Sequence, residues 1–336
     1  MPATPATDLV DGFGRVHRDL RISVTDRCNF RCTYCMPAEG LPWLPRQDLL
    51  TYEELTRIAR VCVERFGFDG IRLTGGEPTV RAHLPVLVEQ LARLGVDLSL
   101  TTNGATLRLL ADDLAAAGLR RINISLDSLR RDRFLEITRR DDLDNVLDGI
   151  DAALEAGLEP VKLNVVVMRG VNDDEIVDFA AFGRAKGVHV RFIEFMPLDA
   201  QQEWTNDQVV TQDEIVATID AAFPLEVVPG RGSDPAARWR YLDGGGDAGV
   251  DIGVIPSVTH AFCDSCDRVR LTAEGSLRHC LFATREMDLR TLLRGGASDD
   301  ELADAIRAEV GAKWAGHQIN QVHFIRPAKS MSQIGG

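Results

Sequence analysis

The chain has 336 residues, of which 45% are hydrophobic and 26% charged, as in a globular protein with a substantial core. The formal net charge of −13 argues against a nucleic-acid-binding protein, although a local cationic pocket remains compatible with it. No apolar run reaches 18 residues and the N-terminus does not resemble a signal peptide, so we expect a cytoplasmic protein with no membrane span and no disulfide bonds.

The first 17 residues are expected to form a flexible arm. From there to residue 223, short β-branched runs alternate with amphipathic helical patterns such as 51–67 and 83–95. This alternation predicts a parallel sheet with right-handed crossovers. Six units predict an α/β fold with a partial (β/α)6 TIM-type barrel over residues 1–223, and an open doubly wound sheet is the alternative. The expected strands are 20–26, 71–76, 98–104, 122–127, 161–168 and 190–197.

Polar residues gather where these strands end, at 74–77, 101–103, 125–127 and 194–197. Both candidate architectures bind ligands at the carboxyl edge of the sheet. We therefore expect a binding site at this edge.

The strand and helix pattern ends near residue 224, where glycine and proline become dense. We expect residues 224–336 to form a smaller C-terminal layer that closes one end of the barrel. A helix is expected over 299–314, and the polar tail 324–336 is expected to lie outside the core.

Six of the seven cysteines fall into two sets, and such clusters in a reducing compartment indicate metal. Cys62 stands alone in a helical pattern and is expected to pack as a small hydrophobe. The first set has C-x3-C-x2-C spacing, one thiolate short of the four that zinc or a cubane takes. A zinc knuckle and a redox C-x2-C pair stay open as readings. A cubane with one open iron could instead chelate a small molecule. The two sets are Cys28, Cys32 and Cys35, and Cys263, Cys266 and Cys280.

The second set could hold zinc, with His260 or His279 as fourth ligand, or a second cubane with an open iron. Arg268 and Arg270 follow it and alternate along an expected strand, so both should face one way. Two guanidiniums beside a cluster suit an anionic substrate, because arginine binds phosphate bidentately.

The first cysteine set, with Tyr34 before its last cysteine, and "GGEP" at 75–78 together resemble the radical S-adenosylmethionine superfamily. The resemblance implies a 4Fe-4S cluster whose open iron binds the methionine amine and carboxylate. One electron would then release a 5′-deoxyadenosyl radical. By the same resemblance, Tyr34, Gly76, Ser125 and Met196 contact S-adenosylmethionine, and the glutamate of "GGEP" grips its amino group.

Motifs along nearly the whole chain, above all "CDSCDRVRLTAEGSLRHCL" and the closing Gly335-Gly336, resemble a narrower family, the GTP 3′,8-cyclases of molybdenum cofactor biosynthesis. That family abstracts the ribose 3′ hydrogen of GTP and joins C3′ to guanine C8, giving (8S)-3′,8-cyclo-7,8-dihydroguanosine 5′-triphosphate. The resemblance implies a second 4Fe-4S cluster on Cys263, Cys266 and Cys280 that binds the guanine end.

The family also implies contacts to GTP and a catalytic role for some residues. Lys162, Arg21 and Arg72 interrupt apolar strands, where a charge is costly unless it is paired or faces a ligand. Surface positions on edge strands are the alternative. In the family, the C-terminal Gly-Gly reaches back into the active site. The implied GTP contacts are Arg21, Arg72, Thr101, Lys162, Arg268, Val269 and Arg270, and the implied catalytic residues are Arg268, Arg270, Gly335 and Gly336.

The resemblance further implies a flavodoxin- or ferredoxin-like electron donor and cyclic pyranopterin monophosphate synthase as the downstream enzyme. A homodimer is considered possible, and no general base is assigned. Two rival functions stay open, a peptide-modifying radical enzyme with an extra cluster and a zinc-stabilised binding or scaffold protein.

Overall fold

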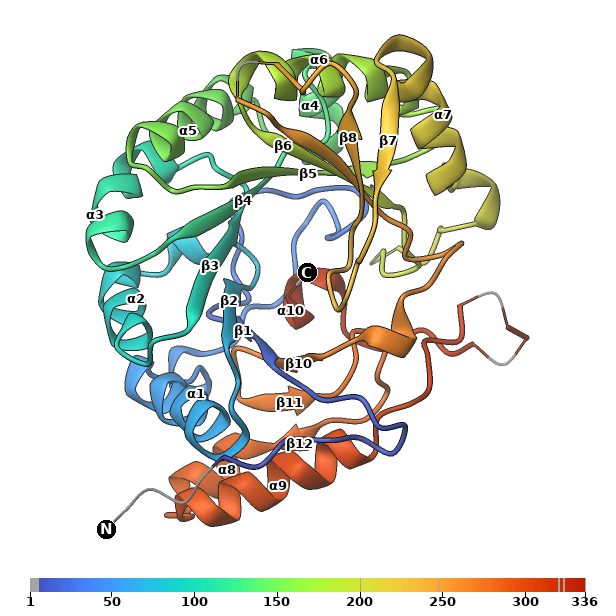
Figure 1. Ribbon diagram of the computed structural model, residues 1–336. Helices are drawn as coiled ribbons and strands as arrows, with labels where there is room; N and C mark the ends of the chain where they lie inside the picture. The colour runs from blue at the N-terminus through green and yellow to red at the C-terminus, as the bar shows by residue number, and fades with distance from the viewer. Residues whose placement is uncertain (1–5, 200, 247, 320, 323, 336) are drawn as a thin grey trace.

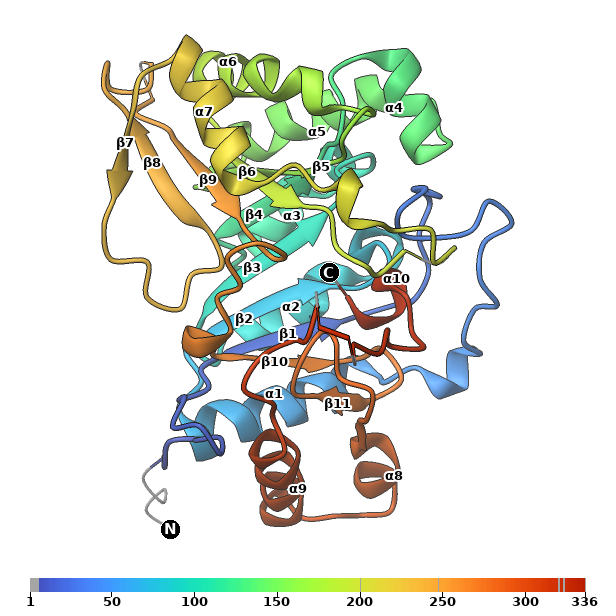
Figure 2. The same cartoon turned by 90° about the vertical axis from the view of Figure 1, so that its right-hand side faces the viewer.

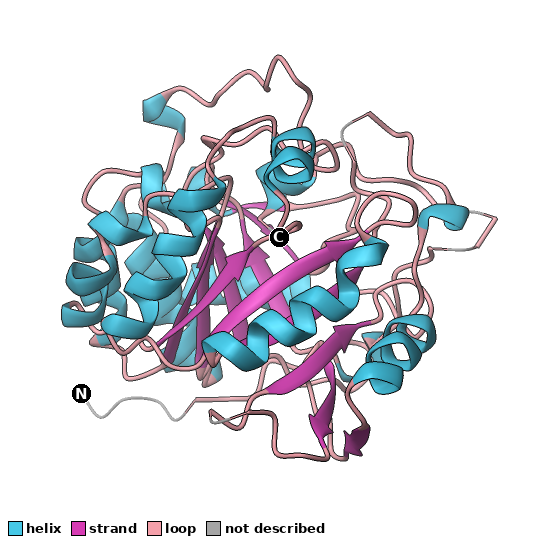
Figure 3. Cartoon of the chain, turned by 90° about the horizontal axis from the view of Figure 1, so that it is seen from above, coloured by secondary structure: helices cyan, strands magenta, loops and turns pink. Residues whose placement is uncertain are grey.

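The six predicted units form one curved parallel sheet with helices on its outer side (Figures 1 and 3). The computed structural model describes residues 6–199, 201–246, 248–319, 321–322 and 324–335. The strands are β1 (Asp19–Ser23), β2 (Gly70–Thr74), β3 (Asp97–Thr102), β4 (Arg121–Ser125), β5 (Val161–Val167) and β6 (His189–Glu194). The helices between and after them are α1 (Tyr52–Phe66), α2 (Leu84–Ala92), α3 (Ala111–Ala116), α4 (Arg131–Thr138), α5 (Leu143–Glu155), α6 (Ile176–Lys186) and α7 (Gln212–Ala222).

This arrangement confirms the partial (β/α)6 barrel. Every predicted strand begins within one residue of the observed start, whereas most of the predicted ends run too far. The overshoot covers the first loop residues at the carboxyl edge, which include polar residues but also apolar ones such as Met168 after β5 and Phe195 and Met196 after β6.

The region from residue 224 adds strands to both edges of the same sheet, where the sequence predicted a smaller C-terminal layer that closes one end of the barrel. β9 pairs in parallel with β6 and β10 in parallel with β1, giving the strand order β12-β11-β10-β1-β2-β3-β4-β5-β6-β9-β8-β7. The added strands are β7 (Leu225–Val228), β8 (Ala237–Tyr241), β9 (Asp251–Ile255), β10 (Arg268–Leu271), β11 (Ser276–Arg278) and β12 (Met287–Asp288).

The last helices lie in two places. α8 (Leu289–Arg294) and α9 (Asp299–Gly311) pack beside the strands next to β1, whereas α10 (Met331–Ile334) lies inside the ring of strands (Figures 1 and 2). The tail was expected outside the core, but Ser332 and Ile334 are buried, so that prediction is wrong. Short 3-10 helices complete the chain: η1 (Arg46–Asp48), η2 (Pro78–Val80), η3 (Leu107–Leu109), η4 (Asp173–Glu175), η5 (Asn206–Gln208) and η6 (Cys263–Ser265).

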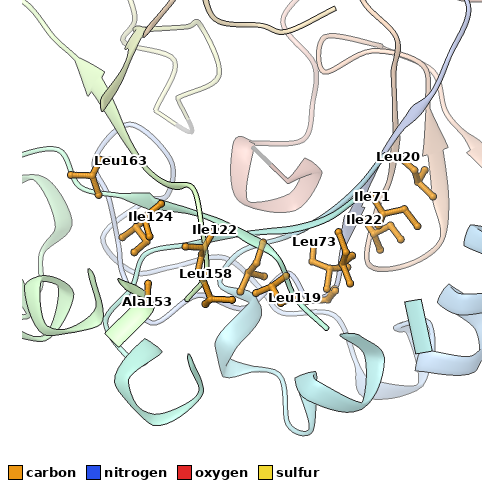
Figure 4. Packing of buried hydrophobic residues seen from close by; sticks show 14 of the residues in the cluster. Leu20, Ile22, Ile71, Leu73, Leu119, Ile122, Ile124, Ala153, Leu158 and Leu163 are labelled. Atoms are coloured by element: carbon orange, nitrogen blue, oxygen red, sulfur yellow. The ribbon is translucent and has the colours of Figure 1, made fainter. Parts of the chain in front are cut away.

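The main hydrophobic core lies between the sheet and the outer helices (Figure 4). Successive side chains of a strand point to opposite faces, so Leu20 and Ile22 of β1 join Ile71 and Leu73 of β2 on the outer face. Fully burying each such side chain stabilises the fold by roughly 1.5–3 kcal/mol. The alternate positions are thereby turned toward the inside of the barrel.

The N-terminal segment is not a flexible arm from residue 9 onward, so that prediction is wrong for residues 9–17. Leu9 and His17 are 1% and 0% exposed, and Asp11 and Arg15 are also buried. A β-bridge joins Val10 to Val16. The arm was predicted because the segment lacks the features of a signal peptide, but its buried polar side chains bond to one another inside the protein. Residues 1–5 lie outside the described part of the chain. Across the described part, no helix has the length and apolarity needed to span a bilayer.

Candidate active site

One cavity of about 310 Å³ occupies the inside of the barrel and is lined by both cysteine sets. The first set lies on the loop after β1, at the carboxyl ends of the parallel strands. Cys266 directly precedes β10, which runs parallel to β1, and Cys280 follows the antiparallel strand β11. The second set therefore lies at the opposite, amino ends of the strands, with the cavity between the two sets.

The loop carrying the first set is held by backbone hydrogen bonds. The amides of Cys35 and Met36 both donate to Cys32 O, at 2.9 Å each. Arg31 N donates to Thr138 O (3.0 Å), and Arg139 donates through Nη1 to the carbonyls of Arg31 and Met36. These bonds fasten the loop to the end of α4, so its thiols are presented on a fixed backbone.

Neither cysteine set forms a site for a single metal ion in the part of the chain that the structure describes. Among the described residues, no three His, Cys, Asp or Glu side chains converge on a point that one ion could occupy. Tetrahedral zinc requires such convergence, whereas an iron–sulfur cubane spaces its thiolates around a larger body. His260, one candidate zinc ligand, is exposed. His279, the other candidate, lines the cavity with Nδ1 2.6 Å from Glu309 Oε1, and its buried Nε2 has no hydrogen-bond partner within the described structure, so it stays available as a ligand.

The surroundings of the first cysteine set disfavour deprotonation of its thiols when no metal is bound. Burial, with Glu77 nearby, raises the pKa of Cys28 to about 12, and burial raises the pKa of Cys35 to about 11. Cationic iron ligation is the chemistry that would offset this cost, because metal-bound cysteine is a thiolate.

The two glycines of "GGEP" allow one loop to run directly against another. A Cβ on Gly75 would lie 2.4 Å from Thr25 O, and one on Gly76 would lie 2.3 Å from Arg27 O. Gly75 also has φ +143°, which side chains rarely adopt. The β2 loop thus supports the backbone that leads to Cys28.

Glu77 joins the ends of β2 and β3. Its carboxylate is buried and accepts hydrogen bonds from Thr79 N (3.0 Å), Thr102 Oγ1 (2.7 Å) and Asn103 N (2.6 Å). Burial raises its pKa. The sequence predicted a carboxylate grip on the methionine amine, and the structure adds a second task, since protein donors engage both oxygens.

A second carboxylate lies near the first set. Tyr34 OH donates to Asp127 Oδ2 (2.7 Å) and Val166 N to Asp127 Oδ1 (2.8 Å), while burial raises the pKa of Asp127 to about 6. The predicted contacts Tyr34, Gly76, Ser125 and Met196 all line the cavity at this end.

A row of cations faces the cavity farther along the strands. The sheet register places Arg270 beside Arg21, Arg21 beside Arg72 and Arg72 beside Ser99. Burial and the charge of Arg72 lower the pKa of Arg21 far below its usual value. Nε and Nη2 of Arg21 are buried without a hydrogen-bond partner in the described structure. Asp19 Oδ1 lies 3.6 Å from Arg21 Nε, beyond hydrogen-bond distance, so these buried donors remain free to bind a further anion.

Lys162, Arg191 and Arg268 line the same cavity. Burial, followed by the charge of Arg191, lowers the pKa of Lys162 to about 8. Sequence reasoning missed Arg191, although it interrupts an apolar strand as Arg21 and Lys162 do. Thr101 also lines the cavity, whereas the side chain of Val269 belongs to the core on the other face of β10, so only its backbone is available to a ligand.

The C-terminal tail packs against the row of cations. Arg270 Nη1 donates to Gly335 O, and Ser23 Oγ donates to Ile334 O at 2.9 Å. A Cβ on Gly335 would lie 2.2 Å from Ser23 Oγ, and its φ is +83°. Only glycine fits this position without displacement. Gly336 lies outside the described residues.

The second set has cationic surroundings. Arg268 Nε lies 3.4 Å and Lys313 Nζ 3.5 Å from Cys266 Sγ. Burial alone would raise the pKa of Cys266, but Arg268 and Lys313 outweigh it and lower the pKa to about 7. This end of the cavity favours negative charge.

Family models match most of the chain. The Radical SAM superfamily model matches residues 22–183 and the Molybdenum Cofactor Synthesis C model matches residues 188–319. Membership of the radical S-adenosylmethionine superfamily implies a 4Fe-4S cluster and S-adenosylmethionine. The expected boundary between residues 223 and 224 stays a prediction.

Solved structures share the fold. Streptococcus suis SuiB bound to S-adenosylmethionine superposes with a TM-score of 0.56 at 14% identity, covering 94% of this chain and 77% of that one. SuiB bound to precursor peptide SuiA gives 0.59 at 13% identity, covering 93% and 75%. At these identities the likeness supports the barrel alone.

Two relatives match the chain from end to end. The GTP 3′,8-cyclase of Mycolicibacterium smegmatis is 49% identical over 340 residues, covering 100% of this chain and 94% of that protein. The GTP 3′,8-cyclase of Streptomyces coelicolor is 50% identical over 332 residues, covering 98% and 96%. The chain belongs to the GTP 3′,8-cyclase family of radical S-adenosylmethionine enzymes.

Proposed function

We propose that this enzyme converts GTP to (8S)-3′,8-cyclo-7,8-dihydroguanosine 5′-triphosphate in molybdenum cofactor biosynthesis. The observation that supports this most strongly is that one cavity has a cysteine set at each end and buried cations between them. A radical source and a triphosphate substrate need this arrangement, because the reacting atoms must meet out of contact with water.

At the carboxyl end, Cys28, Cys32 and Cys35 would hold the cluster. S-adenosylmethionine bound there supplies a 5′-deoxyadenosyl radical after one-electron reduction. The residues for its binding are Tyr34, Gly76, Ser125 and Met196. The carboxylates Glu77 and Asp127 give this end a negative character that suits a sulfonium cation.

At the amino end, we propose that Cys263, Cys266 and Cys280 hold a second 4Fe-4S cluster whose open iron takes the guanine end of GTP. The triphosphate would be held by the row of cations, and the tail ending in Gly335 and Gly336 would close over it. The residues assigned to GTP are Arg21, Arg72, Thr101, Lys162, Arg268, Arg270 and the backbone of Val269. A small flavodoxin- or ferredoxin-like protein would supply the electron, and cyclic pyranopterin monophosphate synthase would take the product.

The test is an anaerobic incubation with S-adenosylmethionine, a reductant and GTP deuterated at ribose C3′. We expect deuterium in 5′-deoxyadenosine together with a cyclised nucleotide in the product mixture. GTP deuterated at C2′ is the matched control and should transfer no label. Unlabelled 5′-deoxyadenosine from C3′-deuterated GTP, without any cyclised nucleotide, would overturn the proposal.

A further inference from the structure

A buried lysine lies directly behind the second cysteine set. Lys313, just after α9, is 5% exposed, and its Nζ donates to Cys266 Sγ at 3.5 Å and to Arg268 O at 2.8 Å. A third neighbour, His17 Nδ1, lies 3.5 Å away. Lysine is almost never fully buried unless it is paired with a negative charge. Of these three contacts of Lys313 Nζ, only the sulfur of Cys266 would carry a negative charge, when it binds a cluster as a thiolate.

The N-terminal segment holds this lysine in place. His17 Nε2 lies 3.0 Å from Asp11 Oδ2, which also accepts from Arg15 Nε at 2.6 Å. Arg15 Nη1 donates to Cys263 O and to Ala315 O, both at 2.8 Å. One buried network therefore joins residues 11–17 to two backbone positions. One is Cys263 of the second cysteine set, and the other is Ala315, two residues after Lys313.

Among the described residues, no lysine or arginine side chain hydrogen-bonds to a thiol of the first cysteine set. The side-chain contacts of Cys28 Sγ are to the neutral amides of Asn29 and Asn103, each at 4.0 Å, and Phe30 N donates to it at 3.3 Å. Glu77 and Asp127 raise the pKa values of these thiols, and Arg31 acts on Cys28 in the opposite direction with a smaller effect than Glu77. The two sets thus differ in the sign of the charge beside their sulfurs.

We propose that Lys313, positioned by Asp11, Arg15 and His17, raises the reduction potential of the second cluster through a charged hydrogen bond to the Cys266 thiolate. The inference rests on the proposed second cluster. A nearby positive charge favours the reduced cluster, which carries one more negative charge than the oxidised cluster. Lys313 thus sets the reduction potential of the second cluster without binding its iron, and the N-terminal segment contributes by holding Lys313 in place.

The test uses the full chain with Cys28, Cys32 and Cys35 replaced by alanine, so that one cluster remains, and an EPR-monitored titration with a chemical reductant. Lys313→Met should shift the midpoint potential to more negative values, and Lys313→Gln should shift it less. Lys313→Arg should leave the potential near that of the parent. Lys329→Met is the matched control, because Lys329 pairs with Glu274 and Glu286 instead, and should cause no shift.

His17→Phe should shift the potential in the same direction by a smaller amount, and should add nothing to the shift of Lys313→Met. An unchanged potential in Lys313→Met with the cluster intact would overturn the inference. If that variant loses the cluster, Lys313→Gln decides, and an unchanged potential there would also overturn it. A parent protein without any second cluster would instead refute the proposed function, and iron analysis distinguishes this case.

Discussion

The two ends of the barrel carry the same number of cysteines in opposite electrostatic surroundings. Near the first set, buried carboxylates dominate and the pKa of Cys28 rises to about 12 because of burial and Glu77. Near the second set, Arg268 and Lys313 overcome the effect of burial and lower the pKa of Cys266 to about 7. Three cysteines alone therefore do not define a site, since the neighbouring charges determine which ligand each end suits.

The difference follows from the strand directions. Barrel enzymes bind ligands at the carboxyl ends of their strands, and the first set obeys this rule. The second set lies at the amino ends because β10 is added in parallel beside β1, with Cys266 just before it. One cavity thereby gains a cationic end without disturbing the anionic end.

Cys32→Ala tests the first end and should have the largest effect. Loss of one of three thiolates removes the radical site, so formation of 5′-deoxyadenosine should fall by at least ~100-fold. Chromatography of reactions with S-adenosylmethionine and dithionite measures it. The matched control is Cys62→Ala in the core of α1, which should cost about 1 kcal/mol of stability and keep the iron content. Equal formation of 5′-deoxyadenosine in both variants would contradict the assignment of the radical site to the first cysteine set.

Arg21→Met tests the row of cations. Its buried Nε and Nη2 have no hydrogen-bond partner in the described structure, so GTP affinity should fall roughly 10- to 100-fold. The substitution removes both the repulsion by Arg72 and the ion pair with Asp19, and these two losses act in opposite directions on the thermal stability of the ligand-free protein. Isothermal titration calorimetry measures the affinity. Arg108→Met, which breaks exposed pairs with Asp148 and Glu155, should leave the affinity unchanged, and a similar loss in both variants would contradict the assignment.

Gly335→Ala tests how the tail closes the cationic end. The added Cβ would clash with Ser23 Oγ, so α10 should leave its place and cyclised product should fall by roughly 10-fold, with iron content unchanged. Hydrogen exchange over residues 331–335 reports the displacement. Gly95→Ala is the matched control, since Gly95 has a positive φ but open space around it. An undisplaced tail with full activity would show that this contact is not needed.

The pH dependence of GTP binding tests Lys162 and should be the smallest effect. Burial and Arg191 lower its pKa to about 8, so the ammonium is charged below that pH and is lost as pH rises through it. Affinity should therefore weaken between pH 8 and pH 9.5, by at most about 10-fold per pH unit. Lys162→Met should bind more weakly at pH 7 and show a flat profile over this range. An identical slope in both proteins would exclude Lys162 as its source.

The six barrel strands, the two cysteine sets and several of the buried cations could be predicted from the sequence because their signals are local. Apolar runs that alternate with helical patterns predicted β1 to β6, and the spacing of the cysteines predicted both cysteine sets. Arg21, Arg72 and Lys162 were predicted as ligand contacts because each interrupts an apolar strand. Each of these signals lies within a few residues of the feature that it predicts.

The rest depended on contacts between distant parts of the chain. Nothing local to Cys266 says that β10 pairs with β1, and this pairing decides at which end the second set lies. The burial of His17 and Asp11 depends on Lys313, nearly 300 positions away. Tail residues such as Ile334 are buried by the barrel wall rather than by their neighbours in sequence.

The most direct test of the two-ended cavity compares two triple variants with the intact enzyme, measuring GTP affinity and cleavage of S-adenosylmethionine in each. Alanine at Cys28, Cys32 and Cys35 should abolish cleavage and keep most of the GTP affinity. Alanine at Cys263, Cys266 and Cys280 should weaken GTP binding and keep slow cleavage without cyclised product. If either triple variant loses both properties while remaining folded by circular dichroism, or loses the property assigned to the other end, the separation of the two ends is contradicted.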